Sequence, residues 1–269
     1  MEKEAELFIN EKYGIAEAPF YVAKNKRLSW VDILAGKLYM MDDGGDITSV
    51  DFGQMIGAAV PIDDDSYMVA AVDGLYKYSN GNITKIRDLT DVYEPYQRSN
   101  DAKFDPKGRL WFGATVYDGQ HEDHGNLFSF EDGNVVLRQP DTKLSNGMAW
   151  NKEADKFYFS DSEEHKIFVY DYDNESGNIT NRKTLFEVTD GVPDGMTIDS
   201  KDNLWVAVWG GNRLEYRDGK TGEKLDEIYV PAKQVSSCCF YGSEKSLFIT
   251  TAGVGLTGEY DGCLFICEL

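Results

Sequence analysis

A short pattern of alternating apolar and aromatic residues recurs along the chain and constrains the fold more than any other feature. Its copies are RLSWVD from residue 27, SYMVAAV from 66, RLWFGAT from 109, KFYFSDS from 156, NLWVAVW from 203 and SLFITTA from 246. Consecutive copies begin 39 to 47 residues apart. Alternation of this kind predicts β-strands, and a regular spacing of about 20–50 residues indicates a repeat architecture.

Further strand-like segments flank these copies. A short apolar segment such as GMAWN or GMTID precedes each copy, and most copies are followed by two more strands, as in NLFSFE and NVVLRQ. Four short strands per unit, separated by turn-forming Gly, Asn and Asp, are typical of a propeller. We therefore predict an all-β fold, a six-bladed β-propeller with four antiparallel strands per blade. The N-terminal segment ELFINEKYG is expected to join the last blade beside CLFICEL and close the ring.

Nothing in the sequence divides the chain into separate units. Neither a helical apolar stripe nor a linker interrupts the series of strands. Residues 1–269 are therefore predicted to form a single propeller domain.

The charge balance narrows the choice of partners. The chain has 27 Lys and Arg against 47 Asp and Glu, a net charge of −20, which disfavours nucleic acid and anionic membranes. The N-terminus, MEKEAELFINEKYG, lacks the basic and apolar regions of a secretion signal. We expect a cytoplasmic monomer or weak homo-oligomer that binds a small molecule.

Four oxygen-bearing side chains occupy equivalent places in the repeat. The innermost strand of each propeller blade lines the central channel, so residues at the starts of these strands converge at one mouth. Before APFYV, DAKFD, GMAWN and GMTID, this place is taken by Glu17, Asn100, Asn146 and Asp194. The sequence therefore predicts a ring of polar side chains at that mouth.

Such a ring suits a divalent cation. Carboxylates and carboxamides gathered in a partly buried place repel or lack partners unless a cation lies among them. Oxygen ligands favour a hard ion, so we expect one Ca²⁺, with Mg²⁺, Mn²⁺ or Zn²⁺ as alternatives. The other interpretation is that Asn and Asp before Gly only form turns. Their recurrence at one place in the repeat favours the metal site.

Further side chains are candidate substrate contacts. Arg98 lies two residues before Asn100, so both side chains point the same way from an extended strand. The Arg98 guanidinium could hold a substrate carboxylate or hydroxyl, or it could form a surface salt bridge. The long loop YDGQHEDHG, residues 117–125, is expected at the same mouth, where His121 or Glu122 would close over a ligand.

Several motifs together resemble one known family. The segments RSNDAKFDPKGRLWFGAT, LSNGMAWN, VPDGMTID and NLWVAVWGG are similar to those of the SMP-30/gluconolactonase/luciferin-regenerating-enzyme (regucalcin-like) family. The resemblance covers about residues 17–252 and implies a propeller with one divalent cation in its channel. It further implies that Glu17, Asn146 and Asp194 bind the metal. Asn100 matches a second-sphere or substrate-contacting asparagine of the family, and Arg98 matches the arginine just upstream of it.

The resemblance implies a metal-dependent lactonase that opens sugar lactones with activated water. In that mechanism Asp194 is the candidate general base as well as a metal ligand. Two alternatives remain at this stage: a non-catalytic propeller that binds calcium or a sugar acid, and a phosphotriesterase-like hydrolase that uses the same metal site.

Overall fold

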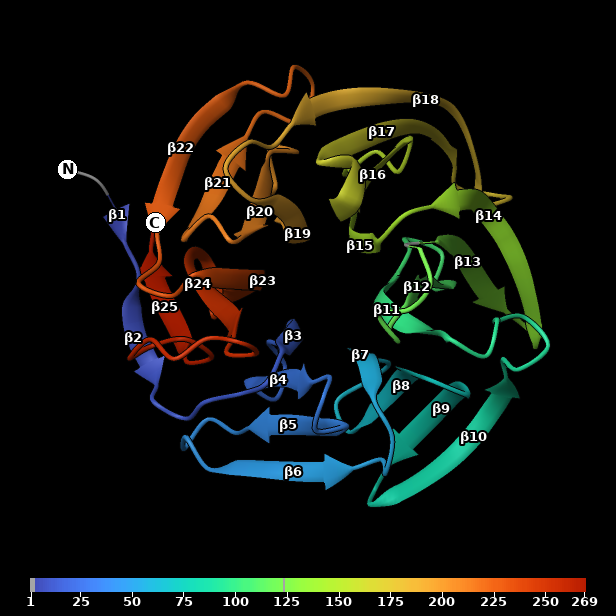
Figure 1. Cartoon of the computed structure of the whole chain (residues 1–269), viewed down its shortest axis with the longest axis horizontal. Coiled ribbons are helices and arrows are strands. Elements are labelled where there is room, and N and C mark those ends of the chain that lie inside the picture. Colours follow the sequence, from blue (N-terminus) through green and yellow to red (C-terminus); the bar gives the residue numbers. More distant parts are fainter. Residues whose placement is uncertain (1–2, 123) are drawn as a thin grey trace.

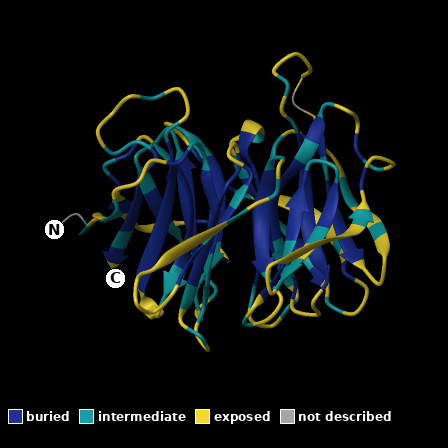
Figure 2. Ribbon diagram, turned by 90° about the horizontal axis from the view of Figure 1, so that it is seen from below, coloured by how far each residue is buried: buried dark blue, intermediate teal, exposed yellow. Residues whose placement is uncertain are grey.

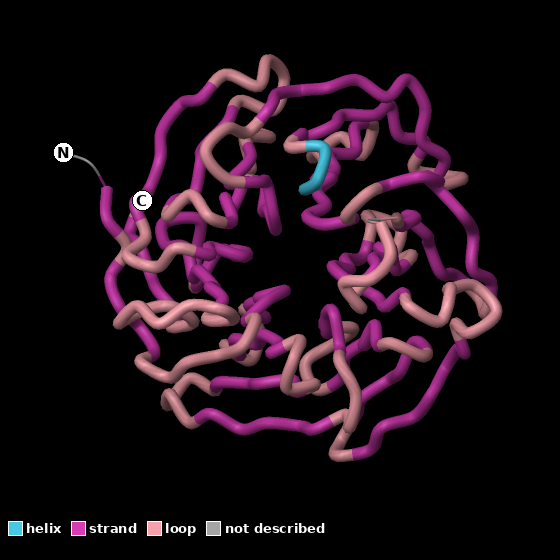
Figure 3. The backbone as a smooth tube through the Cα atoms, viewed as in Figure 1, coloured by secondary structure: helices cyan, strands magenta, loops and turns pink. Residues whose placement is uncertain are grey.

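The chain folds into an all-β propeller, with its β-sheets arranged in a ring around a central axis (Figure 1). A computed structural model describes residues 3–122 and 124–269. Within these residues the helical structure is a short 3₁₀ turn, η1 (Ser162–Glu164), beside the central axis (Figure 3). No helix in this part of the chain is long and apolar enough to cross a bilayer.

Four antiparallel sheets of four strands each make up most of the ring. The first contains β3 (Ala16–Val22), β4 (Arg27–Asp32), β5 (Lys37–Met41) and β6 (Ile47–Asp51). The second contains β7 (Ile56–Pro61), β8 (Ser66–Ala71), β9 (Gly74–Ser79) and β10 (Asn82–Asp88). The third contains β11 (Gln97–Phe104), β12 (Leu110–Val116), β13 (Gly125–Glu131) and β14 (Asn134–Thr142). The fourth contains β15 (Ser145–Trp150), β16 (Lys156–Asp161), β17 (Lys166–Asp173) and β18 (Asn178–Glu187).

The remaining strands form one nine-stranded sheet. Its members are β1 (Lys3–Glu4), β2 (Glu6–Ile9), β19 (Val192–Ile198), β20 (Leu204–Trp209), β21 (Arg213–Arg217), β22 (Lys224–Tyr229), β23 (Gln234–Tyr241), β24 (Ser243–Ala252) and β25 (Leu264–Glu268). The order is β1-β22-β21-β20-β23-β24-β25-β2, and β19 pairs with β20.

The prediction of six separate four-stranded blades is wrong. The described residues form five sheets, because the last two copies of the sequence repeat share the nine-stranded one. This sheet has two parts, one with β20 to β22 and one with β23 to β25. They are joined where Trp209, the last residue of β20, pairs with Gln234, the first residue of β23. The N-terminus adds two strands to this sheet: β1 runs parallel to β22, and β2 pairs with β25 as expected for ELFINEKYG.

The position in the ring explains the composition of each strand. Middle strands such as β12 and β20 lie between covered faces and are buried along almost their whole length, so they read as continuous apolar runs. Outer strands such as β6 and β10 are largely exposed and polar. Figure 2 shows this pattern as a buried interior with exposed loops at both ends of the strands.

Aromatic packing between neighbouring sheets makes the ring rigid. Trp111 of the third sheet packs against Trp150 and Phe157 of the fourth, with ring centroids 5.5 and 4.9 Å apart. Complete burial of one side chain of this kind stabilises the fold by about 1.5–3 kcal/mol. Successive inner strands also contact one another, and β23 contacts β3, so the ends of these strands are held in fixed relative positions.

Candidate active site

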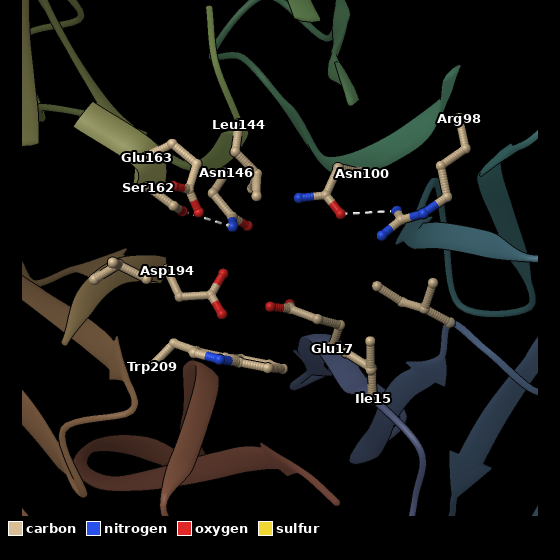
Figure 4. Close-up of a pocket in the computed structure, with 12 residues that line it drawn as sticks. Ile15, Glu17, Arg98, Asn100, Leu144, Asn146, Ser162, Glu163, Asp194 and Trp209 are labelled. Atoms are coloured by element: carbon tan, nitrogen blue, oxygen red, sulfur yellow. Dashed lines mark hydrogen bonds between the residues drawn. The ribbon is translucent and has the colours of Figure 1, made fainter. Parts of the chain in front are cut away.

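A cavity of about 270 Å³ lies among the inner strands (Figure 4). Five of the side chains singled out in the sequence line it: Glu17, Arg98, Asn100, Asn146 and Asp194. They come from β3, β11, β15 and β19, so four separate sheets contribute to one small site. The rest of its lining is mainly apolar and includes Ile15, Leu144 and Trp209.

A backbone irregularity turns these side chains towards the axis. Each innermost strand has a shift in register where it pairs with the next strand. The shifts lie between Glu17 and Phe20, Ile56 and Ala58, Ser99 and Ala102, Ser145 and Met148, Pro193 and Met196, and Val235 and Ser237. An extra residue in one strand bends that strand and redirects a side chain, which is why bulges are common beside active sites.

The glycines after Asn146 and Asp194 are needed for close packing and do not form turns. Gly147 and Gly195 both lie inside strands. A Cβ atom added to Gly147 would lie 2.6 Å from the carbonyl oxygen of Asp194. These glycines therefore let the neighbouring inner strand approach, and the interpretation of NG and DG as turn formers does not hold at these two positions.

The backbone beside Glu17 is strained. Ala18 has a φ of 45°, in the left-handed region that a residue with a Cβ rarely adopts. In this conformation the Ala18 N–H donates a 2.5 Å hydrogen bond to Oε2 of Glu17. The strain thus fixes one carboxylate oxygen of the site, and strain of this kind clusters at functional positions.

Glu17 and Asp194 form a buried acidic pair. Each residue is only 5% exposed, and Figure 4 shows their carboxylates facing one another across the cavity. Burial raises the pKa of Glu17 well above its usual range, and the charges of Asp194 and Asp101 raise it further. Burial and the charge of Asp101 likewise raise the pKa of Asp194. Without a cation, the site therefore favours protonated carboxyls.

The carboxamide of Asn146 has one unused acceptor. Its Nδ2 donates to Oγ of Ser162 at 3.0 Å, which fixes the orientation of the amide, while the buried Oδ1 has no hydrogen-bond partner among the described residues. A buried acceptor without a partner costs about 1–3 kcal/mol. An oxygen left free beside two carboxylates fits a hard divalent cation as its missing partner.

The donor set differs from that of a His- or Cys-rich metal centre. Within residues 3–122 and 124–269, no group of three or more His, Cys, Asp or Glu side chains could hold a metal ion by itself. The set with Asn146 has two carboxylates and one carboxamide oxygen. Such a set suits Ca²⁺, Mg²⁺ or Mn²⁺ better than Zn²⁺ and leaves coordination positions for other oxygens.

Arg98 and Asn100 form a hydrogen-bonded unit in the same cavity. Nη1 of Arg98 donates to Oδ1 of Asn100 and to the carbonyl oxygen of Ser99, both at 2.8 Å. Nδ2 of Asn100 donates to the carbonyl oxygen of Ser145 at 2.9 Å. Burial lowers the pKa of Arg98 to about 10, so the guanidinium is charged at neutral pH and its other N–H groups remain available to a ligand.

Glu122 lies outside this cluster. It is exposed on the loop between β12 and β13 and does not line the cavity. On the same loop, the His121 ring stacks on Tyr96 with ring centroids 3.7 Å apart. The substrate contact assigned to Glu122 from the sequence stays a prediction that requires movement of this loop.

Sequence reasoning singled out none of the other seven residues that line the cavity, and two of these, Glu163 and Trp209, bear on its chemistry. Glu163 lies on η1 and lines the cavity, whereas its neighbour Glu164 is held outside by Lys143 and Lys166. Trp209 ends one of the recurring apolar motifs, so it resembled a core residue. The sequence around Glu163 does not distinguish it from an exposed acidic residue, and the sequence around Trp209 does not distinguish it from a buried aromatic one.

Two residues of opposite charge, Asp101 and Lys103, lie farther along β11. Asp101 follows Asn100 within the β11 bulge, and Lys103 comes two residues later. Burial raises the pKa of Asp101 and lowers that of Lys103, while their mutual attraction opposes both shifts. Nζ of Lys103 also donates to the carbonyl oxygen of Met196 at 3.0 Å, which connects β11 to β19.

Comparison with known proteins now identifies the family. The family model for the SMP-30/gluconolactonase/LRE-like region matches residues 15–253. The chain belongs to this family. The resemblance seen in the sequence is thereby confirmed, and the matched range includes every cavity residue named above.

Relatives of this SMP-30/gluconolactonase/LRE-like chain include proteins named as lactonases. A “Putative sugar lactone lactonase YvrE” from Bacillus subtilis (strain 168) is 36% identical over 95% of this chain and 91% of its own length. “Pentonolactonase XacC” from Haloferax volcanii is 32% identical over 92% of this chain and 84% of its own. A solved luciferin-regenerating enzyme superposes with a TM-score of 0.90 at 26% identity, covering 96% of this chain and 92% of the other.

Proposed function

We propose that this chain is a divalent-metal-dependent hydrolase that opens a sugar lactone, in the manner of a gluconolactonase. The observation that carries the proposal is the pair of facing buried carboxylates, Glu17 and Asp194, beside the free Oδ1 of Asn146. The names of the lactonase relatives support the choice of substrate.

Glu17, Asn146 and Asp194 would hold the cation, for which we propose Ca²⁺ before Mg²⁺, Mn²⁺ or Zn²⁺. When bound, it would supply Lewis-acid polarisation of the lactone carbonyl and lower the pKa of a bound water. The hydrogen bonds from Ala18 N–H to Glu17 and from Asn146 to Ser162 hold two of these side chains in place before a ligand arrives.

Asp194 is the proposed general base. Its carboxylate faces the cavity, and it would accept the proton of the attacking water as the new C–O bond forms. Ser162 also lines the cavity, but its Oγ donates to the carbonyl oxygen of Pro193 at 2.6 Å and accepts from Asn146. That hydroxyl is committed to structure, so attack by water fits the cavity better than attack by a serine.

Arg98 and Asn100 would orient the substrate. The guanidinium supplies fixed N–H donors for hydroxyl or carbonyl oxygens, and Asn100 holds it in position at 2.8 Å. Holding the ring in one orientation lowers the entropic cost of reaching the transition state.

Hydrolysis of a panel of aldonolactones with each cation in turn tests this proposal. We expect turnover that a chelator removes, and a loss of at least about 10³-fold in kcat for Asp194→Asn. Asp226→Asn is the matched control, because Asp226 is exposed on β22, does not line the cavity and forms a salt bridge with Lys3 at 2.9 Å. Turnover by Asp194→Asn equal to that of the parent would refute the mechanism.

The same assay separates the two other functions considered. Faster turnover of phosphotriesters than of any lactone would favour the phosphotriesterase-like reaction. Calorimetric binding of the cation or of an aldonic acid, with no turnover in the whole panel, would favour a binding protein.

A further inference from the structure

Trp209 occupies an unusual place for a tryptophan of this fold. The other tryptophans, Trp30, Trp111, Trp150 and Trp205, are buried at 0, 0, 8 and 3% exposure. Trp209 is partly exposed, lines the cavity and belongs to none of the apolar clusters among the described residues. Its ring contacts no other aromatic ring in that part of the chain, and its Nε1 has no hydrogen-bond partner there.

The backbone of Trp209 is held from both sides. Trp209 pairs with Val192 of β19 on one side and with Gln234 of β23 on the other. A Cβ atom on Gly191 would lie 2.6 Å from the carbonyl oxygen of Trp209, so the neighbouring turn is packed directly against it. The contact that joins the two parts of the nine-stranded sheet therefore also fixes one wall of the cavity.

The two sides of the cavity differ in chemistry. In Figure 4 the indole of Trp209 extends alongside the carboxylates of Asp194 and Glu17. Arg98 and Asn100, which carry N–H donors, lie on the opposite side. A sugar lactone has the same two-sided character, because its hydroxyls project from the ring edge while its C–H groups form an apolar face.

We propose that Trp209 is a specificity-determining residue that stacks on the C–H face of the sugar ring. This inference rests on the proposed lactonase function and deepens it. An aromatic face provides a large, rigid apolar surface, and the free Nε1–H adds a donor for one ring hydroxyl. The cavity of about 270 Å³ lies near the lower end of the roughly 300–1,000 Å³ typical of small-molecule pockets, a size that suits a single sugar ring.

Two substitutions of Trp209 test the stacking. Trp209→Phe keeps an aromatic face, whereas Trp209→Leu keeps apolar volume without one. Because stacking acts on substrate and transition state alike, Trp209→Leu should raise KM about tenfold with little change in kcat, and Trp209→Phe should stay within about threefold of the parent. Calorimetric cation affinity should not change in either variant, since the indole is not among the proposed ligands.

A second measurement does not depend on catalysis. The lactam analogue of a six-carbon aldonolactone keeps the ring but resists hydrolysis, so its Kd can be measured directly by calorimetry. We expect this Kd to follow KM in the variants. Binding of the lactam should also change the tryptophan fluorescence of the parent, and Trp209→Phe should bind the lactam without that change, because the other four tryptophans are buried.

The outcomes distinguish this inference from the proposed function. If lactones are hydrolysed but Trp209→Leu leaves KM and the lactam Kd unchanged, the stacking is wrong and the lactonase stands. If no lactone is hydrolysed but the lactam binds and Trp209→Leu weakens it about tenfold, the lactonase is wrong and the sugar-ring contact stands. Should the parent bind neither compound, both proposals are wrong.

Discussion

Replacing Gly147 by Ala probes how the inner strands position Asp194. The added Cβ would lie 2.6 Å from the Asp194 carbonyl oxygen and 2.8 Å from the Met196 nitrogen, both backbone atoms that cannot rotate away. Ordinary contact begins at 3.4 Å, so β15 and β19 must separate by about 0.8 Å. Ser160 Oγ donates to that same carbonyl oxygen at 2.8 Å, and the shift would stretch this bond beyond hydrogen-bonding distance.

The cost can be estimated from these contacts. Overpacking of this kind costs about 1–3 kcal/mol, and loss of one buried hydrogen bond adds about 1 kcal/mol. We therefore expect Gly147→Ala to lower the free energy of unfolding by about 3 kcal/mol. Because the carboxylate of Asp194 moves with its backbone, kcat should fall by up to about 10²-fold.

Urea unfolding of the metal-free protein measures the first effect, and lactone hydrolysis measures the second. Gly44→Ala is the matched control, because Gly44 is exposed and its added Cβ would lie 3.2 Å from a side-chain oxygen of Asp42 and near no backbone atom of a neighbouring strand. If Gly147→Ala were as stable as Gly44→Ala, close approach of β15 and β19 would not explain the glycine. The interpretation of NG as a turn would then have to be reconsidered.

Two further predictions concern charge in the cavity. Since the pKa values of Glu17 and Asp194 are raised on folding, the folded metal-free chain holds more protons than the unfolded chain above about pH 4, and this contribution to stability is lost as pH rises towards neutrality. In Glu17→Gln, the midpoint of urea unfolding should fall less steeply with rising pH than in the parent. If the midpoints of parent and variant fell in parallel with pH, the raised pKa of Glu17 would be contradicted. Glu163→Gln should raise KM for a lactone about fivefold, more than Glu122→Gln does, because Glu163 already lines the cavity. A larger effect of Glu122→Gln would instead indicate that the loop of residues 117–125 closes over the ligand.

The local pattern was sufficient to predict most of the cavity's polar residues. Strand periodicity places equivalent residues of a repeat at equivalent heights, so Glu17, Asn100, Asn146 and Asp194 could be grouped without coordinates. The bulges that turn these side chains inward were not predicted, since their register shifts depend on which neighbouring strand pairs with which residue.

The nine-stranded sheet shows where the repeat pattern misleads. The regular spacing of the six repeats predicts that each repeat forms a separate sheet. Whether the last residue of β20 also pairs with β23 depends on the distance between their backbones. The spacing of residues along the chain does not give that distance. Trp209 and Gln234 lie 25 residues apart in the chain, and only the curvature of the ring brings their backbones together.

The sequence by itself determined the all-β propeller class, the family and the oxygen-bearing side chains at the starts of the inner strands. All three depend on residue type and regular spacing, which a linear pattern carries. Tertiary structure alone decided that the last two repeats share a sheet, that Glu17 and Asp194 face one another, that Oδ1 of Asn146 is left free and that Trp209 forms a cavity wall. Those features depend on distances between strands far apart in sequence, and such distances are set only when the ring closes.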